Sequence, residues 1–313
     1  MERILKEKIL FPIIENFIIT REAYYLHQAN LASGGTIEKG ILNIKKRWLH
    51  KIKLDHESQP IFIFSAGWRS GSTLVQRLIM SSKKYFIWGE PYGGAGIIEN
   101  LANQFRSFTN RWPVEQNFLS QIDCSDLEYK WIANLTPDIE DLIDAHITYL
   151  KRLFYYPIRN DYYGWGLKEV RLNYEHAIYL NFLFPNAKFI FLVRNPLHAY
   201  RSYKRFRRWY ISIPDKPVFN AISFARFWNF LAKGFFENKH KVNCILIKYE
   251  DLKSQPLNTL SELSKFLNIS INQTVLTRKV GSSNPKKFHL NLIERLIIKV
   301  FTRKTALLYG YYK

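Results

Sequence analysis

Five short apolar runs follow residue 60 and predict the strands of a sheet. They are rich in β-branched and aromatic residues and cover residues 60–66, 85–89, 165–168, 188–193 and 243–252. Longer segments with helical spacing of apolar residues separate them, and the clearest helix begins at Pro196. Strands that alternate with helices indicate an α/β fold of three layers, with a central mainly parallel sheet flanked by helices.

The first 57 residues differ from the rest of the chain. They are basic and have helical periodicity, with one break at the sequence ASGGT. We therefore expect an N-terminal helical extension over residues 1–57 and a second domain over residues 58–313. Residues 1–20 are amphipathic, which suits a helix docked on the protein surface or a peripheral contact with a membrane or partner.

The charge balance narrows the range of partners. Lys and Arg total 46 and Asp and Glu total 26, which gives a net charge of +20. This excess favours an anionic partner, either nucleic acid, a membrane surface, or an anionic substrate or cofactor. The longest stretch without a charged residue or histidine is about 12 residues, short of the roughly 20 that span a bilayer. No signal peptide is recognisable, and the two cysteines, Cys124 and Cys244, suggest neither a disulfide framework nor a zinc site. These features favour a cytoplasmic protein.

The sequence IFIFSAGWRSGSTLV at residues 61–75 predicts a tight turn between a buried strand and a helix. Such a turn directs backbone N–H groups and the positive end of the helix at one point, which suits phosphate or sulfate. Gly67 and Gly71 permit close approach, Arg69 adds a charge, and hydroxyl groups come from Ser70, Ser72 and Thr73. The alternative is an ordinary turn in which Ser72 is the N-cap. The Gly-Lys-Ser/Thr ending of nucleotide-hydrolysing loops is missing.

A second anion site is suggested by Arg194 and Ser202. Arg194 ends a hydrophobic strand, and Ser202 lies eight residues later, about two turns into the next helix. The arginine would bind a phosphate and the serine would donate to another of its oxygens. A solvated arginine is the alternative.

These two motifs together resemble the sulfotransferases that use 3′-phosphoadenosine 5′-phosphosulfate (PAPS). Residues 69–73 are similar to the family's 5′-phosphosulfate loop, and Arg194 with Ser202 is similar to its 3′-phosphate site. The closer resemblance is to the branch that contains protein-tyrosine sulfotransferases and related bacterial sulfotransferases. Glu90 in a Gly-Glu pair and Lys168 match residues of that branch, and Tyr249 resembles the family's tyrosine near the cofactor. The resemblance extends over about residues 61–252, and the sequence VGSSN at 280–284 resembles the C-terminal cofactor loop only loosely.

The resemblance implies a P-loop-like fold and sulfuryl transfer from PAPS to an acceptor hydroxyl, with no metal ion. It implies that Glu90 is the general base and that Arg69 and Lys168 stabilise the leaving group. The implied cofactor-binding residues are Arg69, Ser70, Gly71, Ser72, Thr73, Arg194, Ser202, Tyr249 and Ser283. We expect the acceptor to be a glycan or small molecule, with a peptide tyrosine as the alternative. The oligomeric state stays open.

Other readings of these residues remain. Glu90 would also suit a surface position before Pro91, and Lys168 could pair with Glu169 or another nearby carboxylate. One face of a helix is basic and would either line a groove for an anionic acceptor or be exposed to solvent; its residues are Arg201, Lys204, Arg205 and Arg208.

The sequence leaves two other functions open. One is an ATP-dependent kinase, which should have a loop lysine, and the other is a nucleic-acid-binding protein. The second is suggested by the charge and by aromatic residues among the basic ones, namely Tyr203, Phe206 and Trp209.

Overall fold

The computed structural model describes residues 35–129, 131–204, 218–277 and 289–312. These form two compact units. Residues 35–51 and 101–138 belong to the smaller unit, and the other described residues belong to the larger one. The division into an extension over 1–57 and a domain over 58–313 stays a prediction.

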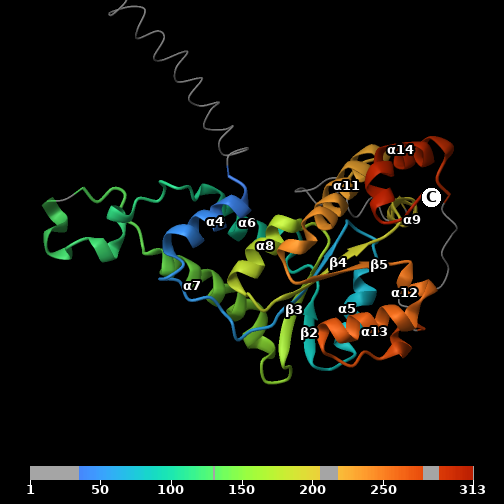
Figure 1. The fold of residues 1–313 in the computed structure, drawn as a ribbon, viewed down its shortest axis with the longest axis horizontal. Helices are drawn as coiled ribbons and strands as arrows, with labels where there is room; N and C mark the ends of the chain where they lie inside the picture. The colour runs from blue at the N-terminus through green and yellow to red at the C-terminus, as the bar shows by residue number, and fades with distance from the viewer. Residues whose placement is uncertain (1–34, 130, 205–217, 278–288, 313) are drawn as a thin grey trace, which may run out of the picture. The chain divides into compact units, whose positions relative to one another are not determined.

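All five predicted strands are present in the larger unit. They are β1 (Ile61–Ser65), β2 (Tyr85–Trp88), β3 (Gly164–Glu169), β4 (Lys188–Val193) and β5 (Cys244–Lys248). They form one sheet in the order β2-β3-β1-β4-β5, and every neighbouring pair is parallel. Helices flank this sheet (Figure 1), so the predicted P-loop-like α/β fold is confirmed.

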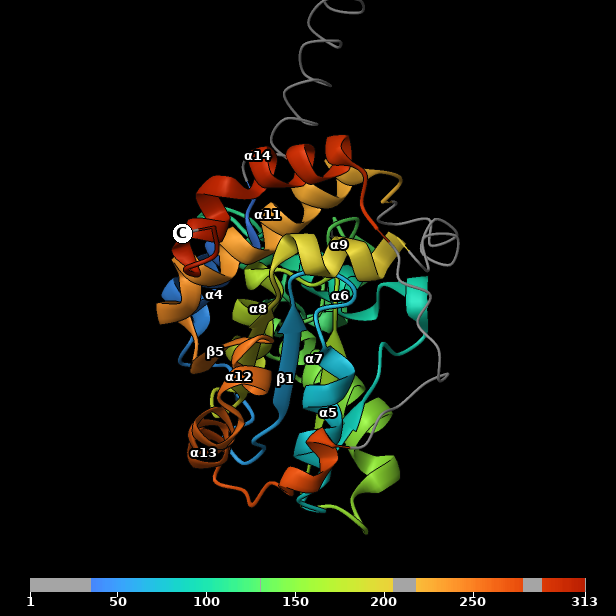
Figure 2. The same ribbon diagram turned by 90° about the vertical axis from the view of Figure 1, so that its right-hand side faces the viewer.

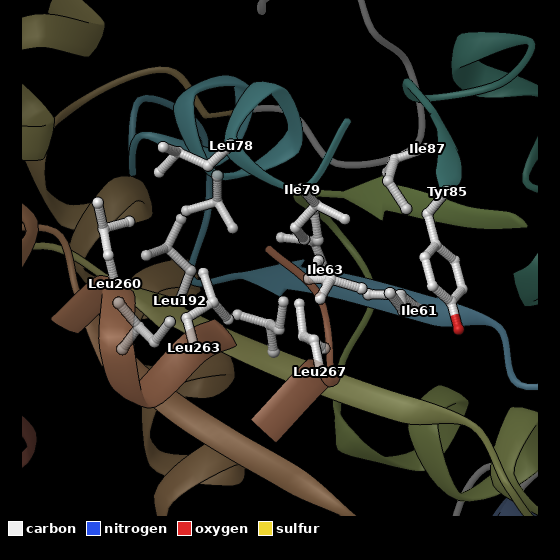
Figure 3. Close-up of a cluster of buried hydrophobic side chains, with 14 of the residues drawn as sticks. Ile61, Ile63, Leu78, Ile79, Tyr85, Ile87, Leu192, Leu260, Leu263 and Leu267 are labelled. Carbon is white, nitrogen blue, oxygen red and sulfur yellow. The ribbon is translucent and has the colours of Figure 1, made fainter. Parts of the chain in front are cut away.

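Aliphatic residues alternate with phenylalanines along β1 and β4. The sheet therefore has one aliphatic face and one aromatic face. On the aliphatic face, Ile61 and Ile63 of β1 and Leu192 of β4 pack against α5 (Ser72–Met80) and α13 (Pro256–Leu267). Figure 3 shows this cluster, in which the apolar residues of both helices point toward the strands. Burial of these side chains fixes α5, and therefore the loop before it, on the sheet.

The intervening residues form the aromatic face. Phe62 and Phe189 have ring centroids 5.3 Å apart, and Phe191 stacks on Phe235 at 4.6 Å. Phe235 belongs to α11 (Ala221–Asn238), which therefore covers this side of β4. A strand buried on both faces reads as a continuous apolar run, as β1 and β4 do.

Among the described residues, the larger unit has five further helices. They are α7 (Ile139–Leu150), α8 (Tyr174–Leu183), α9 (Pro196–Lys204), α12 (Asp251–Ser254) and α14 (Leu292–Leu308). Figure 2 shows α14 lying along α11, with α9 beside both. A π-helical turn spans Lys151–Tyr155, and short 3₁₀ turns occupy Gly93–Ala95, Tyr156–Ile158, Lys239–Lys241 and Gln273–Leu276.

The smaller unit is built on α4 (Ile37–Trp48), which begins at its N-cap Thr36. Trp48 is fully buried, packs edge-on against Phe118 at 5.7 Å, and donates from Nε1 to Glu115 at 2.9 Å. Helix α6 (Ile97–Gln104) belongs to this unit with its last four residues, 101–104. The 3₁₀ turns of this unit span Phe105–Ser107, Glu115–Asn117, Leu119–Gln121 and Cys124–Tyr129. None of the helices in the described ranges has the length and apolar character that a bilayer-spanning segment needs.

Candidate active site

The loop between β1 and α5 has three alternate residues with positive φ. Gly67, Arg69 and Gly71 have φ angles of 79°, 65° and 95°. Alternation of this kind curls the chain so that successive N–H groups face one concave surface, which is a typical anion site. Gly71 is the N-cap of α5, so the interpretation of Ser72 as the N-cap is wrong. Ser72 is instead the first helical residue, and no side chain in the described part of the chain caps this end of the helix with a hydrogen bond.

Tyr249 closes one side of this loop. A Cβ atom added at Gly71 would lie 2.2 Å from Cδ2 of the Tyr249 ring, so only glycine fits there. The Arg194 guanidinium carbon also lies against this ring, 4.4 Å from its centroid. The tyrosine thus links the loop to the end of β4.

Arg194, Arg69 and Ser202 meet directly. The Arg194 guanidinium donates to the main-chain oxygen of Arg69 at 2.8 Å, and Arg69 Nε donates to Ser202 Oγ at 3.1 Å. Trp228 Nε1 donates to the main-chain oxygen of Arg194 at 3.1 Å, which fixes the backbone behind it. Burial lowers the pKa of Arg194. The two predicted phosphate motifs, 125 residues apart in sequence, therefore form one cationic cluster.

Glu90 and Lys168 form an ion pair at the same edge of the sheet. Trp88 of β2 is in register with Leu167 of β3, so the residues just beyond them emerge side by side. Lys168 is only 6% exposed, and its ammonium group contacts the Glu90 carboxylate. The alternative interpretation, in which Lys168 pairs with a nearby carboxylate, therefore holds, and that carboxylate is the predicted base, Glu90. The role of Lys168 at the leaving group stays a prediction.

A pocket of about 490 Å³ brings most of the predicted residues together. Its predicted lining residues are Arg69, Gly71, Ser72, Thr73, Glu90, Arg194 and Tyr249. Sequence reasoning missed six others: Trp68, Leu74, Arg77, Val170, Lys253 and Leu276. Arg77 follows Thr73 by four residues, a spacing that places both on one helix face and could have revealed it. Lys253 had no such signal; its Nζ lies 5.1 Å from the Tyr249 ring centroid.

Two buried donors at this site have no hydrogen-bond partner among the described residues. They are the hydroxyl of Ser70 and Nε of Arg194. Buried polar groups in proteins are normally hydrogen-bonded, so an acceptor is expected here. With the surplus of cations in the pocket, these donors fit a ligand that carries several anionic oxygens.

Glu250 supports the Arg194 side of the site and was not identified from the sequence. Its carboxylate accepts from the main-chain N–H of Asn195 at 3.1 Å and from the hydroxyl of Tyr311 at 2.7 Å. Burial acts to raise the pKa of Glu250, but the hydrogen bonds from His198, Tyr311 and Asn195 outweigh it and lower the pKa. The ionised carboxylate holds the start of α9, directly after Arg194.

Glu169 is a second buried carboxylate, next to Lys168. It is 5% exposed, and its carboxylate lies 3.7 Å from the Arg171 guanidinium. Burial raises the pKa of Glu169 to about 7 despite the opposing attraction of Arg171. Arg171 also donates to the main-chain oxygen of Gly93, in the turn that follows Glu90.

Several other predicted residues lie outside the described residues or away from the pocket. Ser283 and residues 280–284 lie outside the described residues, as do residues 1–20, Arg205, Phe206, Arg208 and Trp209. Tyr203 is buried and donates to the main-chain oxygen of Val218 at 2.6 Å, so its ring is not available to stack on a base. In the described ranges, no group of three or more His, Cys, Asp or Glu residues could hold a metal ion.

Comparison with known proteins agrees with these motifs. A model of the sulfotransferase family matches residues 60–273. Human sulfotransferase 1C2 is 26% identical over 115 residues, which is 34% of this chain and 38% of the human protein. The alignment thus spans well under half of that relative's length, and the rabbit protein of the same name gives the same values.

Solved sulfotransferase structures are also similar. The sulfotransferase domain from the curacin biosynthetic pathway has a TM-score of 0.44 and 16% identity, covering 82% of this chain and 99% of that domain. Mouse sulfotransferase SULT7A1 complexed with PAP has a TM-score of 0.42 and 13% identity, covering 89% of this chain and 95% of the mouse chain. Because the family model matches well over half of its residues, the chain belongs to the sulfotransferase family.

Proposed function

We propose that this protein transfers the sulfuryl group of PAPS to an acceptor hydroxyl. The observation that carries the proposal is a single pocket in which an anion-binding loop and several cations face one carboxylate, Glu90. Membership of the sulfotransferase family supports the same reaction. Neither a kinase nor a nucleic-acid-binding protein is favoured, since the loop has no lysine and Tyr203 is buried.

The donor would bind through its two phosphate ends. The loop of residues 69–73 suits the 5′-phosphosulfate, because it begins a helix and because Arg69, Ser72 and Thr73 line the pocket. Arg194 and Ser202 suit the 3′-phosphate, and Tyr249 would position the nucleotide between them. Ser283 completes this proposed set. Arg77 and Lys253 add charge to the same pocket, as a ligand with several negative charges requires.

The reaction makes one bond to sulfur and breaks another. The acceptor oxygen attacks the sulfur in line, and the bond from sulfur to the bridging phosphate oxygen breaks. The electron pair stays on that oxygen, where Arg69 and Lys168 offset the new negative charge. The acceptor proton passes to the Glu90 carboxylate during attack.

The contact between Glu90 and Lys168 supports this division of roles. An ammonium group that touches the base and lies at the same sheet edge as the loop would fix the distance between the base and the leaving oxygen. Preorganised charges of this kind lower the barrier because they need no rearrangement when the bond breaks.

For the acceptor we propose a hydroxyl of a glycan or small molecule, with a peptide tyrosine as the alternative. The predicted cytoplasmic location, the bacterial type and the membrane contact of residues 1–20 stay predictions. Mass spectrometry of sulfated products, in cells that express the wild-type protein and in cells that express a Glu90→Gln variant, distinguishes the two acceptor classes.

Purified protein then tests the base. With the acceptor so identified and PAPS labelled in its sulfuryl group, Glu90→Gln should lower kcat by about 10²–10⁴ because general-base help is removed. Donor affinity should stay near that of the wild type, because the base faces the acceptor. A variant that keeps more than about a third of wild-type kcat would show that Glu90 is not the base.

A further inference from the structure

Helix α14 exposes a row of large apolar side chains. Leu292, Ile293, Leu296, Val300 and Leu307 are 81%, 70%, 63%, 61% and 48% exposed. None of the described residues covers them. Single exposed apolar residues are ordinary, but five on one helix form a patch that marks an interaction site.

The opposite side of α14 already has a partner. Ile298, Thr302, Thr305 and Ala306 are buried, and the helix packs along α11 and beside α9. Figure 2 shows α14 as the outer helix of this layer. The exposed residues are therefore not needed for docking α14 on its own fold.

Helical geometry places the exposed apolar residues in one stripe with cations beside it. Leu296, Val300 and Leu307 are spaced by four and seven residues, so they share one side of the helix. Lys299 and Arg303 lie along one edge of this stripe and Lys304 along the other, and all three are exposed. The helix has a single acidic residue, Glu294, which is turned inward to pair with Lys204 at 2.8 Å.

We propose that α14 docks this protein on the interface of an anionic lipid membrane. An apolar stripe flanked by lysine and arginine is typical of helices that lie in the headgroup region, where the alkyl stems extend the apolar surface and the charges reach the phosphates. The outward face of α14 has no carboxylate to repel such lipids, and the net charge of +20 adds to the attraction.

The charges also argue against a second copy of the chain as the occupant. Two copies that met through this face would bring the same cations together, with no carboxylate on the face to offset them. The proposal is independent of the sulfuryl-transfer reaction, because the stripe contributes no residue to the pocket. It adds that the enzyme works at a membrane surface.

Vesicle co-sedimentation of the full chain tests the proposal. Vesicles of phosphatidylcholine alone are compared with vesicles that also contain phosphatidylserine. The wild type should bind the anionic vesicles, and binding should weaken as salt is added. Lys299→Gln/Arg303→Gln should bind roughly tenfold to thirtyfold more weakly, at the usual contribution of each cation near an anionic surface. Leu296→Gln/Val300→Gln should lose at least about tenfold, because the apolar contact is removed.

A matched control lies on α13, where Leu257 is 64% exposed and Lys265 is also exposed. Leu257→Gln/Lys265→Gln should bind vesicles like the wild type, and circular dichroism should show equal melting for all variants. The proposal is overturned if the wild type binds neither vesicle, or if either α14 variant binds as well as the control. It is also overturned if sedimentation velocity reveals a dimer that Leu296→Gln/Val300→Gln abolishes, since the face would then join two copies.

Discussion

Gly71 lies in the anion-binding loop directly against the Tyr249 ring. Its φ of 95° and the 2.2 Å that would separate an added Cβ from the ring both require glycine. We expect Gly71→Ala to displace Tyr249 or the loop and so to weaken binding of adenosine 3′,5′-bisphosphate by about tenfold or more, at the usual cost of about 1–3 kcal/mol for a strained backbone. Isothermal titration measures this.

Gly310 provides the matched control for this substitution. It also has a positive φ, 74°, but a Cβ there would have no atom of the described residues within 4 Å. Gly310→Ala should therefore lower stability slightly and leave ligand affinity unchanged. Equal ligand affinity in the two variants would show that the contact with Tyr249 does not shape the site.

The buried Glu169 should make the stability of the protein depend on pH. Its pKa is raised from 4.5 in the unfolded chain to about 7 in the fold, so the folded state holds the extra proton between these values. Stability from this group is present at low pH and is lost as the pH rises through about 7. Urea unfolding from pH 5 to pH 8 should show a decline in the wild type that Glu169→Gln removes, on the order of 2 kcal/mol. The exposed Glu262→Gln is the control, and parallel curves for Glu169→Gln and wild type would contradict the prediction.

The site could be predicted in part from the sequence, and the residues show why. Arg69, Arg194 and Ser202 were identified because their spacing reflects the ends of strands and the turns of a helix. The direct pairing of Glu90 with Lys168 depends on the register between β2 and β3, which no local pattern encodes. Other residues that support the site, such as Arg171 and Glu250, contact main-chain atoms of distant residues, so no local pattern marks them either.

At the scale of elements, the strands were the most predictable part of the fold. The alternation of isoleucine and phenylalanine in β1 and β4 already separates the two faces of the sheet, because successive side chains point to opposite sides. Helix starts were also readable, as at Pro196, which begins α9. The order of the strands in the sheet could not be predicted, because it depends on pairing between residues far apart in sequence.

Tyr311, near the end of the chain, supports the start of α9 through Glu250. Its hydroxyl donates to the ionised Glu250, which holds the start of α9. A hydrogen bond to a charged group contributes about 1.5–3 kcal/mol, so Tyr311→Phe should lower the free energy of unfolding by that amount. Tyr312→Phe is the control, since the partners of its hydroxyl, Thr302 at 3.4 Å and the main chain of Leu197, are neutral. Its loss should cost less, about 1 kcal/mol. Equal losses in urea unfolding would show that Glu250 does not depend on Tyr311.

At the scale of the whole molecule, positively charged residues gather in at least two regions. Arg69, Arg77, Arg194 and Lys253 line the pocket, and a second group of cations borders the apolar stripe of α14. Charge alone therefore could not identify the partner, and the anion-binding loop was needed to favour a phosphorylated donor. The division into two compact units also escaped prediction, because residues 101–138 join a unit that begins far earlier in the chain.

The central claim is that the pocket binds a nucleotide with both a 3′-phosphate and a 5′-phosphate. The most direct test is calorimetric titration of adenosine 3′,5′-bisphosphate and of adenosine 5′-phosphate into the wild type and Arg194→Ala. The wild type should bind the bisphosphate more tightly, and Arg194→Ala should weaken that binding by about tenfold to a hundredfold, with a much smaller effect on the monophosphate. A wild type that does not bind the bisphosphate, or a variant that loses both ligands equally, would contradict the account.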